Sequence, residues 1–380
     1  MGIIENPQRD GHLIYSAKTR RHEYGYRRRV WKQRGKILLI LLVAALVIAA
    51  GVFGVLKIKD RVLAAKSAPE KEVIELEGFN DPDAPAAGEI IGEFPEEPEV
   101  PEKMEKLPFF EGYEVYKDGD TKTIYNEEII SNYAILIDLK TGHVVAERNG
   151  FSKMYPASMT KVLTLLVAVE HLDDMKATFT MTQDIADFVY KNDCSQVGYS
   201  VGETMTVEEL LYGLIMPSGG DAALALAKCV AGNMEDFVVL MNEKVAELGL
   251  ADVAHFTNPI GIFDEENYCT PAAMAMIMKA ALENPVCRDV LGQHIYKTEP
   301  TEEHPEGITL SNLFLRRIED KETGGEVLGA KTGYVNESGN CAVSYEITEN
   351  DNRYICVTGA SKGAWRCIYD HCDIYNGFAE

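Results

Sequence analysis

The sequence predicts an α+β fold, in which an antiparallel sheet is flanked by helices and interrupted by an inserted helical domain. Two segments with strand patterns come first, a long run of helical patterns follows, and three strand patterns and a last helix close the chain. This order indicates that the helical run is inserted between the two groups of strands. Ahead of the domain, the sequence predicts one transmembrane helix and a disordered stalk.

Residues 1–36 form a basic tail with ten Lys and Arg against three Asp and Glu, whereas the whole chain has a net charge of −23. The apolar run 37–56 holds twenty residues without a charge, enough for a helix of about 30 Å, the thickness of a hydrocarbon core. The basic tail should stay in the cytoplasm and place the rest of the chain outside. We therefore expect a single-pass anchor in the cell membrane; a cleaved signal peptide is the competing interpretation, although its apolar core is usually shorter.

Residues 57–108 form the predicted stalk, which is rich in Glu and Pro. A segment of this composition cannot bury enough apolar surface to fold, so it should be extended and hold the domain that follows, residues 109–380, away from the membrane. Residues 37–380 carry a net charge of −30. An acidic body repels phosphates, so we expect no nucleic-acid partner.

The folded domain is expected to open with a hairpin. Strand patterns over residues 133–139 and 143–147 flank Lys140-Thr141-Gly142, which has the composition of a turn. The next element, Tyr155–His171, is apolar from Val162 to Val169 except for a single threonine. A helix that is apolar on all sides is normally buried.

Ser158 and Lys161 lie in the first turn of this predicted helix, where a spacing of three residues puts both side chains on one face. A hydroxyl beside an amine suits a nucleophile, Ser158, with its base, Lys161. The simpler alternative is a helix start with a surface lysine, because a Ser-x-x-Lys pair alone is a weak signal.

The helical subdomain is expected over about residues 172–295. Thr206 and Glu209 form a capping box that opens one helix, and Thr270-Pro271 opens another with a cap and a first-turn proline. The helix after the capping box is predicted from its apolar residues at 210, 211, 214 and 215, and three further helices are predicted over 221–230, 234–248 and 271–282. After the polar loop 298–306, the predicted elements are strands 326–332, 341–347 and 354–358 and a helix over 365–378.

The eight cysteines all follow the predicted membrane segment and are spread along the domain: Cys194, Cys229, Cys269, Cys287, Cys341, Cys356, Cys367 and Cys372. Their wide spacing and apolar neighbours favour buried free thiols over a disulfide framework. The sequence has no Cys-x-x-Cys pair and no His-Glu-x-x-His motif, so we expect no metal and no cofactor.

Three motifs stand in order along the chain: Ser158-Met159-Thr160-Lys161, Ser218-Gly219-Gly220 and Lys331-Thr332-Gly333. Together they resemble the active-site set of penicillin-recognising serine enzymes. The flanking stretches YPASMTKVLT, TVEELLYGLIMPSGGDAA and GAKTGYVNESGNCAV resemble the low-molecular-mass D-alanyl-D-alanine carboxypeptidases, penicillin-binding proteins that trim peptidoglycan stems. The resemblance covers about residues 132–380 and implies a β-lactamase/transpeptidase-like fold.

The resemblance implies a role for each motif in acyl transfer, which needs a nucleophile, a base, an oxyanion hole and a proton path. Ser158 would attack the carbonyl between two D-alanines. Lys161 would take its proton and must be neutral, which burial and a nearby cation, Lys331, would favour by lowering its pKa. Ser218 would relay a proton to the leaving nitrogen.

The third motif would bind the substrate. Lys331 and Thr332 would hold its terminal carboxylate, and Gly333 completes the motif. The backbone N–H groups of Ser158 and Tyr334 would form the oxyanion hole, the latter carried over from its position after the motif in the family. Gly220 belongs to the same substrate-binding set by its place in the second motif.

Each motif also has a plain structural interpretation. Ser218-Gly219-Gly220 would suit a loop between helices, and Lys331-Thr332-Gly333 a turn, like Lys140-Thr141-Gly142. Order separates the two Lys-Thr-Gly copies, because only the later one follows both other motifs and precedes two strands. Asn258 and Asn312 match positions where the family often has Asn, and we expect them to be structural.

The chain departs from the family's pattern in two places. The second motif usually ends in Asn, whose amide contacts the lysine and the substrate carbonyl, but here Gly220 has no side chain. Many members also carry a C-terminal extension that ends in a membrane helix, whereas this sequence stops at Glu380. We therefore expect residues 37–56 to supply the anchor.

The expected function is that of a membrane-anchored serine D-Ala-D-Ala carboxypeptidase that acts on peptidoglycan pentapeptide stems and is acylated by β-lactam antibiotics. A β-lactamase-like hydrolase is one alternative, although the sequence has neither Ser-Asp-Asn nor the expected Glu-x-x-Leu-Asn loop. A wall-binding scaffold with a weakened site is the other, and Gly220 is its only support. Labelling by fluorescent penicillin separates the three.

Overall fold

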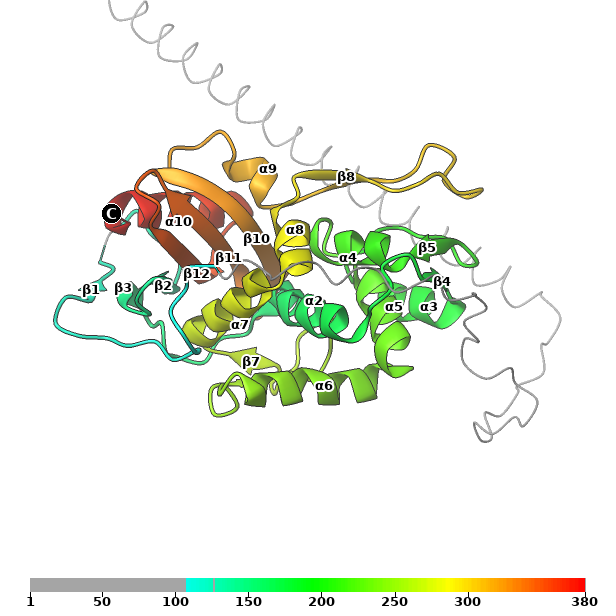
Figure 1. Ribbon diagram of the computed structural model, residues 1–380, viewed down its shortest axis with the longest axis horizontal. Helices are drawn as coiled ribbons and strands as arrows, with labels where there is room; N and C mark the ends of the chain where they lie inside the picture. The colour runs from blue at the N-terminus through cyan, green and yellow to red at the C-terminus, as the bar shows by residue number, and fades with distance from the viewer. Residues whose placement is uncertain (1–106, 126, 380) are drawn as a thin grey trace, which may run out of the picture. The chain divides into compact units, whose positions relative to one another are not determined.

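The computed structural model describes residues 107–125 and 127–379 (Figure 1). The predicted basic tail, transmembrane helix and almost all of the stalk, residues 1–106, lie outside the described residues. Within residues 107–125 and 127–379, every helix is too short or too polar to cross a membrane.

A six-stranded sheet with the order β1-β3-β2-β12-β11-β10 forms the centre of the fold. Its outer pair, β1 and β3, is parallel, and all other neighbours are antiparallel. The α+β class expected from the sequence is thus confirmed. The strands are β1 (Lys122–Thr123), β2 (Tyr133–Asp138), β3 (Val144–Arg148), β10 (Gly325–Val335), β11 (Gly339–Thr348) and β12 (Arg353–Ser361).

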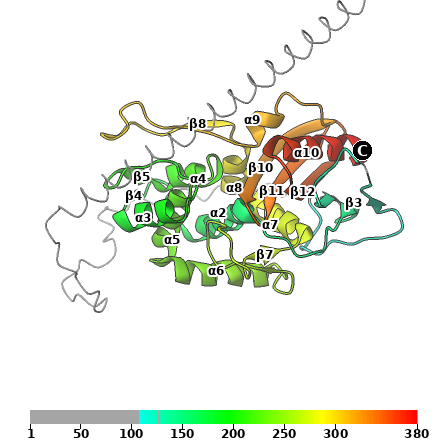
Figure 2. The same ribbon diagram turned by 180° about the vertical axis from the view of Figure 1, so that it is seen from behind.

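Helices cover both faces of the sheet. Successive residues of a strand point to opposite faces, and both faces carry apolar side chains that the helices bury. Along β12, Ile355 and Val357 join the core beneath α7 (Pro271–Glu283), while Cys356 joins the core beneath α10 (Ala364–Phe378). The short helix α9 (Leu315–Ile318) packs against β10 and α10 (Figure 2). The edge strand β10 is thereby flanked by α9 as well as by α8 (Pro285–Gly292).

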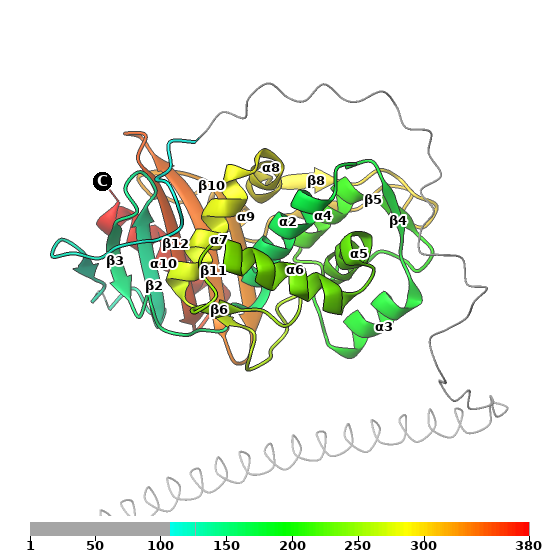
Figure 3. The same ribbon diagram turned by 60° about the horizontal axis from the view of Figure 1, so that its bottom comes forward.

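Helix α2 (Thr160–His171) is the buried helix expected from its apolar sequence, and Thr160 to Ala168 are all buried. Figure 3 shows the helices between α2 and α7 clustered beside α2 and away from β2 and β3. These helices are α3 (Gln183–Lys191), α4 (Val207–Ile215), α5 (Gly220–Ala231) and α6 (Met234–Glu247). The sequence analysis missed α3 and α8.

Two predicted helix starts are confirmed in atomic detail. The Thr206 side chain accepts a hydrogen bond from the Glu209 N–H, and the Glu209 carboxylate accepts one from the Thr206 N–H, which completes the capping box of α4. Thr270 caps α7 by accepting from the Ala273 N–H. Each cap satisfies backbone groups that have no partner inside the helix.

Three short two-stranded antiparallel sheets complete the described fold. They are formed by β4 (Thr178–Thr180) with β5 (Thr204–Thr206), β6 (Ala254–His255) with β7 (Tyr268–Cys269), and β8 (Ile295–Lys297) with β9 (Thr309–Ser311). The polar loop predicted at 298–306 joins β8 to β9. Buried Glu203 fixes this loop to the helical part by accepting hydrogen bonds from Thr301 Oγ1 at 2.7 Å and from His304 Nδ1 at 2.8 Å.

All eight cysteines are free, and six of them are buried. The prediction of free thiols is therefore confirmed. Burial raises the pKa of the Cys229 thiol to about 11 and that of the Cys367 thiol to about 12, so both thiols stay protonated at neutral pH. In the described part of the chain, His, Cys, Asp and Glu side chains form no group that could hold a metal ion.

Candidate active site

Ser158 lies in a short 3-10 turn, Ala157–Met159, directly ahead of α2. It therefore precedes the α-helix, whereas the sequence analysis had placed it in the first turn of that helix. Ala157 has a φ of 45°, a left-handed conformation that costs a residue with a side chain about 1–2 kcal/mol. Gly261 packs so close that an added Cβ would lie 1.9 Å from the Ala157 carbonyl oxygen. The surrounding chain thus fixes a strained turn under the Ser158 hydroxyl.

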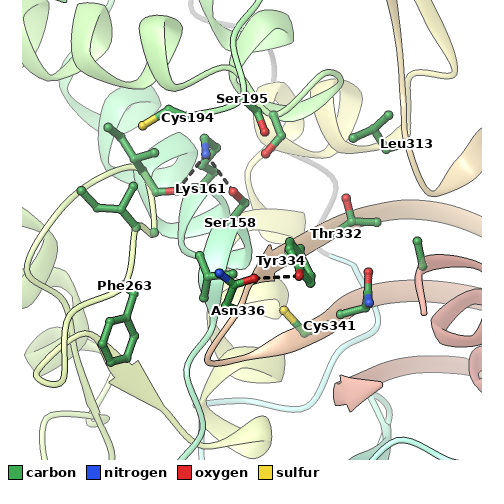
Figure 4. Close-up of a pocket in the computed structure, with 18 of the residues that line it drawn as sticks. Ser158, Lys161, Cys194, Ser195, Phe263, Leu313, Thr332, Tyr334, Asn336 and Cys341 are labelled. Carbon is green, nitrogen blue, oxygen red and sulfur yellow. Dashed lines mark hydrogen bonds between the residues drawn. The ribbon is translucent and has the colours of Figure 1, made fainter. Parts of the chain in front are cut away.

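The Lys161 ammonium lies beside this hydroxyl (Figure 4). Its Nζ donates a hydrogen bond to Ser158 Oγ at 3.0 Å and another to the Ile260 carbonyl at 2.8 Å. The side chain is buried, and burial lowers the pKa of Lys161 to about 7, while electrostatic interactions with Cys194 and Asp221 oppose this shift. A substantial fraction of the Lys161 side chains is therefore uncharged at neutral pH and able to accept a proton.

The Ile260 carbonyl is positioned by Asn258, whose side-chain oxygen accepts hydrogen bonds from the N–H groups of Ile260, Gly261 and Ile262. Asn258 is buried and holds a loop, in agreement with the structural role expected for it. Asn312 is also buried, and its side-chain oxygen accepts from two backbone N–H groups at the start of α9.

A second Ser–Lys pair joins the other two motifs. Lys331 Nζ donates to Ser218 Oγ at 2.9 Å and to the Thr332 carbonyl at 2.8 Å. Burial and, secondarily, the charge of Lys161 lower the pKa of Lys331 well below its usual value. The sequence analysis had expected burial and the charge of Lys331 to lower the pKa of Lys161. Burial does lower it, whereas the effect of the neighbouring cation falls on Lys331.

Ser218 has a φ of 67°, and Gly220 begins α5. The space above Gly220 is filled by a loop, since an added Cβ would lie 3.0 Å from Cys194 Cβ and 3.2 Å from the Ser195 carbonyl oxygen. The Gly220 N–H donates to that carbonyl at 2.7 Å. The residues of this loop therefore occupy the place that a longer side chain at position 220 would need.

Asp221 holds the same loop in place. Its buried carboxylate accepts hydrogen bonds from the Val197 N–H at 2.9 Å and from the Gly198 N–H at 3.0 Å. From the sequence, Asp221 was expected to help orient a water or backbone group at the place of the missing amide of Gly220, whereas Cys194 had no assigned role. No local pattern indicates the role of Cys194, because it arises only when the loop folds over the start of α5.

Strand β10 lies against the Ser158 turn because Gly333 has no side chain. A Cβ at Gly333 would come within 2.7 Å of Cys341 Sγ, 2.8 Å of the Pro156 carbonyl oxygen and 3.0 Å of the Ser158 nitrogen. This close approach is the physical reason for glycine at the third position of the last motif. It brings Thr332 and Tyr334 to the cavity that Ser158 faces.

A cavity of about 540 Å³ connects these groups. Ser158, Lys161 and Ser218 line it together with Thr332 and residues 333–335, whereas Lys331 is buried outside its lining. Other residues that line the cavity were not singled out as site residues in the sequence, among them Asp193, Cys194, Phe263, Leu313, Arg317 and Glu337. A hydroxyl with an adjacent amine at the wall of such a cavity is suited to nucleophilic acyl transfer.

Comparison with known proteins agrees with this chemistry. Residues 120–362 match the sequence model of a family described as D-alanyl-D-alanine carboxypeptidase, peptidase family S11. The chain is 33% identical over 228 residues to the D-alanyl-D-alanine carboxypeptidase DacF of Bacillus subtilis, a match that covers 60% of this chain and 57% of that protein. It is 34% identical over 204 residues to DacB2 of Mycobacterium tuberculosis, covering 53% of this chain and 65% of that protein. The chain thus spans less than two thirds of the length of these relatives.

The fold is similar to that of solved structures. The DD-transpeptidase of Streptomyces K15 is 28% identical, with a TM-score of 0.61, over 65% of this chain and 96% of that one. A D-alanyl-D-alanine carboxypeptidase of Mycobacterium tuberculosis is 25% identical, with a TM-score of 0.56, over 72% of this chain and 94% of that one.

Proposed function

Because the chain belongs to the D-alanyl-D-alanine carboxypeptidase family, we propose that it removes the terminal D-alanine from peptidoglycan stem peptides through an acyl-enzyme on Ser158. The observation that carries this proposal is the pair of Ser–Lys hydrogen bonds, 3.0 Å at Ser158 and 2.9 Å at Ser218, whose serines line one cavity. The first pair provides a nucleophile with its base, and the second provides a path for the proton.

In the proposed acylation, neutral Lys161 takes the proton of Ser158 as its Oγ attacks the carbonyl between the two D-alanines. The carbonyl oxygen becomes negatively charged and is stabilised by backbone N–H groups of Ser158 and Tyr334, which border the same cavity. Ser218, which accepts a hydrogen bond from Lys331, relays the proton taken up by Lys161 to the leaving nitrogen, so that Lys161 is neutral again. The C–N bond then breaks, and D-alanine leaves.

Water completes the proposed cycle by attacking the acyl-enzyme, again with Lys161 as the base. The loop of Cys194 and Ser195 fills the space above Gly220, and this supports an intact rather than a decayed site. We therefore favour an enzyme over a wall-binding scaffold.

The test combines D-alanine release from a peptide ending in D-Ala-D-Ala with labelling by a fluorescent penicillin. A carboxypeptidase releases D-alanine and keeps the label for a long time. Rapid loss of the label with turnover of the penicillin would indicate a β-lactamase, and the absence of both label and D-alanine release would indicate a scaffold.

We further propose that residues 37–56 anchor the protein in the cell membrane with the domain outside the cytoplasm. The support is the apolar run and the excess of basic residues before it. Protease added to intact cells should release the domain by cutting near residues 66–106. A mature protein that begins after Leu56 in N-terminal sequencing would show instead that the segment is a cleaved signal peptide.

A further inference from the structure

We propose that Glu346 is a pH-sensitive lock for α10: its uncharged carboxyl group lets this helix pack on the sheet, and its ionisation loosens the helix as the pH rises. Glu346 lies on β11, and its side chain is fully buried. Helix α10 supplies Ala364 and Cys367 to the lining of the active-site cavity, whereas Glu346 lies outside that lining. The lock therefore acts on a wall of the cavity from inside the core.

The alternation of side chains along β11 places Glu346 beneath α10. Ser344, two residues earlier, is hydrogen-bonded to His371 and Tyr375 on α10 at 2.8 Å and 2.7 Å. Residues two apart on a strand share one face of the sheet, so Glu346 points to the same side as Ser344. In agreement with this placement, the charge of Glu346 raises the pKa values of Cys372 and Tyr375 on that helix.

Both carboxyl oxygens of Glu346 are buried, and among the described residues neither one has a hydrogen-bond partner. The Thr323 hydroxyl lies close enough to oppose the pKa shift of Glu346, but it donates its proton to the Gly325 carbonyl at 3.1 Å. A buried carboxylate without hydrogen bonds or a counter-ion is far less stable than the neutral acid. Burial therefore raises the pKa of Glu346 to about 7, so the packed state keeps its proton at a pH where an exposed glutamate is charged.

The titratable side chains around Glu346 give it no positive charge. On β10 its neighbour across the strands is Val327, which is apolar. Burial lowers the pKa of His371 on α10 to about 3, so this imidazole is neutral. Lys321, in the loop before β10, pairs with Asp320. The remaining titratable groups on β12 and α10 are phenols and thiols, which are uncharged at neutral pH: Tyr354, Cys356, Cys372 and Tyr375.

Asp370 on α10 shows what a buried carboxylate needs in this fold to remain charged. It is also fully buried, but it accepts hydrogen bonds from the N–H groups of Ile130 and Ser131 at 3.2 Å and 2.9 Å. It also pairs with Arg366 Nε at 2.8 Å. Glu346 has no such partners among the described residues. The lack of partners, and not burial alone, therefore makes Glu346 sensitive to pH.

The direction of the pH effect follows from these surroundings. When α10 moves away, water reaches Glu346 and its pKa returns to the usual 4.5, whereas it is about 7 in the packed state. Between these two values the displaced state binds fewer protons than the packed state, so a rising pH favours displacement. The ratio of displaced to packed molecules should rise by up to tenfold per pH unit from 4.5 to about 7 and then level off.

The test compares the wild type with Glu346→Gln, whose amide has the shape of the acid but cannot ionise. Hydrogen exchange of the α10 amides, corrected for the intrinsic rate, gives the opening equilibrium of the helix. We would measure it by mass spectrometry at about pH 5 and about pH 8, on either side of the pKa of about 7. The ratio of the opening constant of the wild type to that of the variant should rise roughly 10- to 100-fold between the two, because every other titrating group is common to both proteins.

Glu326→Gln is the matched control, because it removes an exposed carboxylate from the adjacent strand β10, and its α10 amides should exchange like those of the wild type at both pH values. Helix α7, on the opposite face of the sheet, is the internal reference and should show no change in the ratio. Glu346→Met, which also cannot ionise, gives the same comparison if the amide of Gln does not fit the core.

A ratio for α10 that stays constant between the two pH values would refute the lock, because Glu346 would then titrate alike in both states. An equal rise in α7 would also refute it, since the whole domain rather than α10 would respond to the pH. None of these measurements uses a substrate, so their outcome is independent of the proposed function.

Discussion

Ser158→Ala is expected to abolish both the release of D-alanine and the covalent binding of penicillin. Loss of the nucleophile in a serine hydrolase lowers kcat on the order of 10⁶-fold, and no other hydroxyl in the described chain shares the hydrogen bond that Lys161 makes with Ser158. The fold should survive, because the hydroxyl only accepts this one hydrogen bond, a contribution of about 0.5–1.5 kcal/mol. A thermal melt of the purified variant measures that part of the expectation.

Ser152→Ala provides the matched control, since Ser152 is exposed and lies outside the cavity lining. It should release D-alanine and bind penicillin at the wild-type rate. Labelling retained in Ser158→Ala, with the adduct mapped to Ser218 or Ser195 by mass spectrometry, would show that another serine is the nucleophile.

Lys161→Met is expected to lower the rate of acylation by about 10²–10⁴-fold, the usual contribution of a general base. Methionine keeps much of the length and apolar surface of the side chain, so the variant avoids leaving a permanent charge in a buried position. In the wild type, the neutral amine is the active form, and burial lowers the pKa of Lys161 to about 7. Acylation should therefore reach a plateau above pH 7 and fall about tenfold per pH unit well below it. This decline should disappear in the variant.

The measurement is the acylation rate constant for penicillin between pH 5 and 9 in stopped-flow fluorescence, a range set by the pKa of about 7. Lys279→Met is the control for removing a buried lysine, because Lys279 is as buried as Lys161 but pairs with Glu283 on α7. It should keep the pH dependence of the wild type. A variant at position 161 that is slow but still loses rate below pH 7 would place the titrating base elsewhere, with Lys331 as the first candidate.

Local chemistry explains which helices the sequence predicted. The capping box of Thr206 and Glu209 and the cap at Thr270-Pro271 are local patterns, and the structure contains both. Helix α8 was missed although it begins with the same signal, an Asn284 cap followed by Pro285. Helix α3 buries only Ile185 and Val189, so its apolar pattern is weak. The omission of α8 was avoidable, because its start signal is present in the sequence.

The contacts of the site also fall into two groups: those that local sequence spacing predicts and those that depend on how the chain folds. The spacing of Ser158 and Lys161 puts both on one turn, and this contact was predictable from the sequence. The pairing of Ser218 with Lys331 required the resemblance to a family, because more than a hundred residues separate them along the chain. Arg317, which also lines the cavity, had no signal in the sequence, since its place there depends on how α9 packs beside β10.

The pairing of β2 with β12 also sets the order in which a newly made chain can complete its structure. Residues 133–138 are synthesised early, whereas their partners at 354–359 come near the C-terminus. Until then, the edge of β2 that faces away from β3 carries unpaired backbone groups, which can pair with other chains. Such long-range pairings form slowly and leave partly folded chains prone to aggregation. A chain cut short before β12 therefore exposes an open strand edge, and chaperones or proteases are expected to act on it.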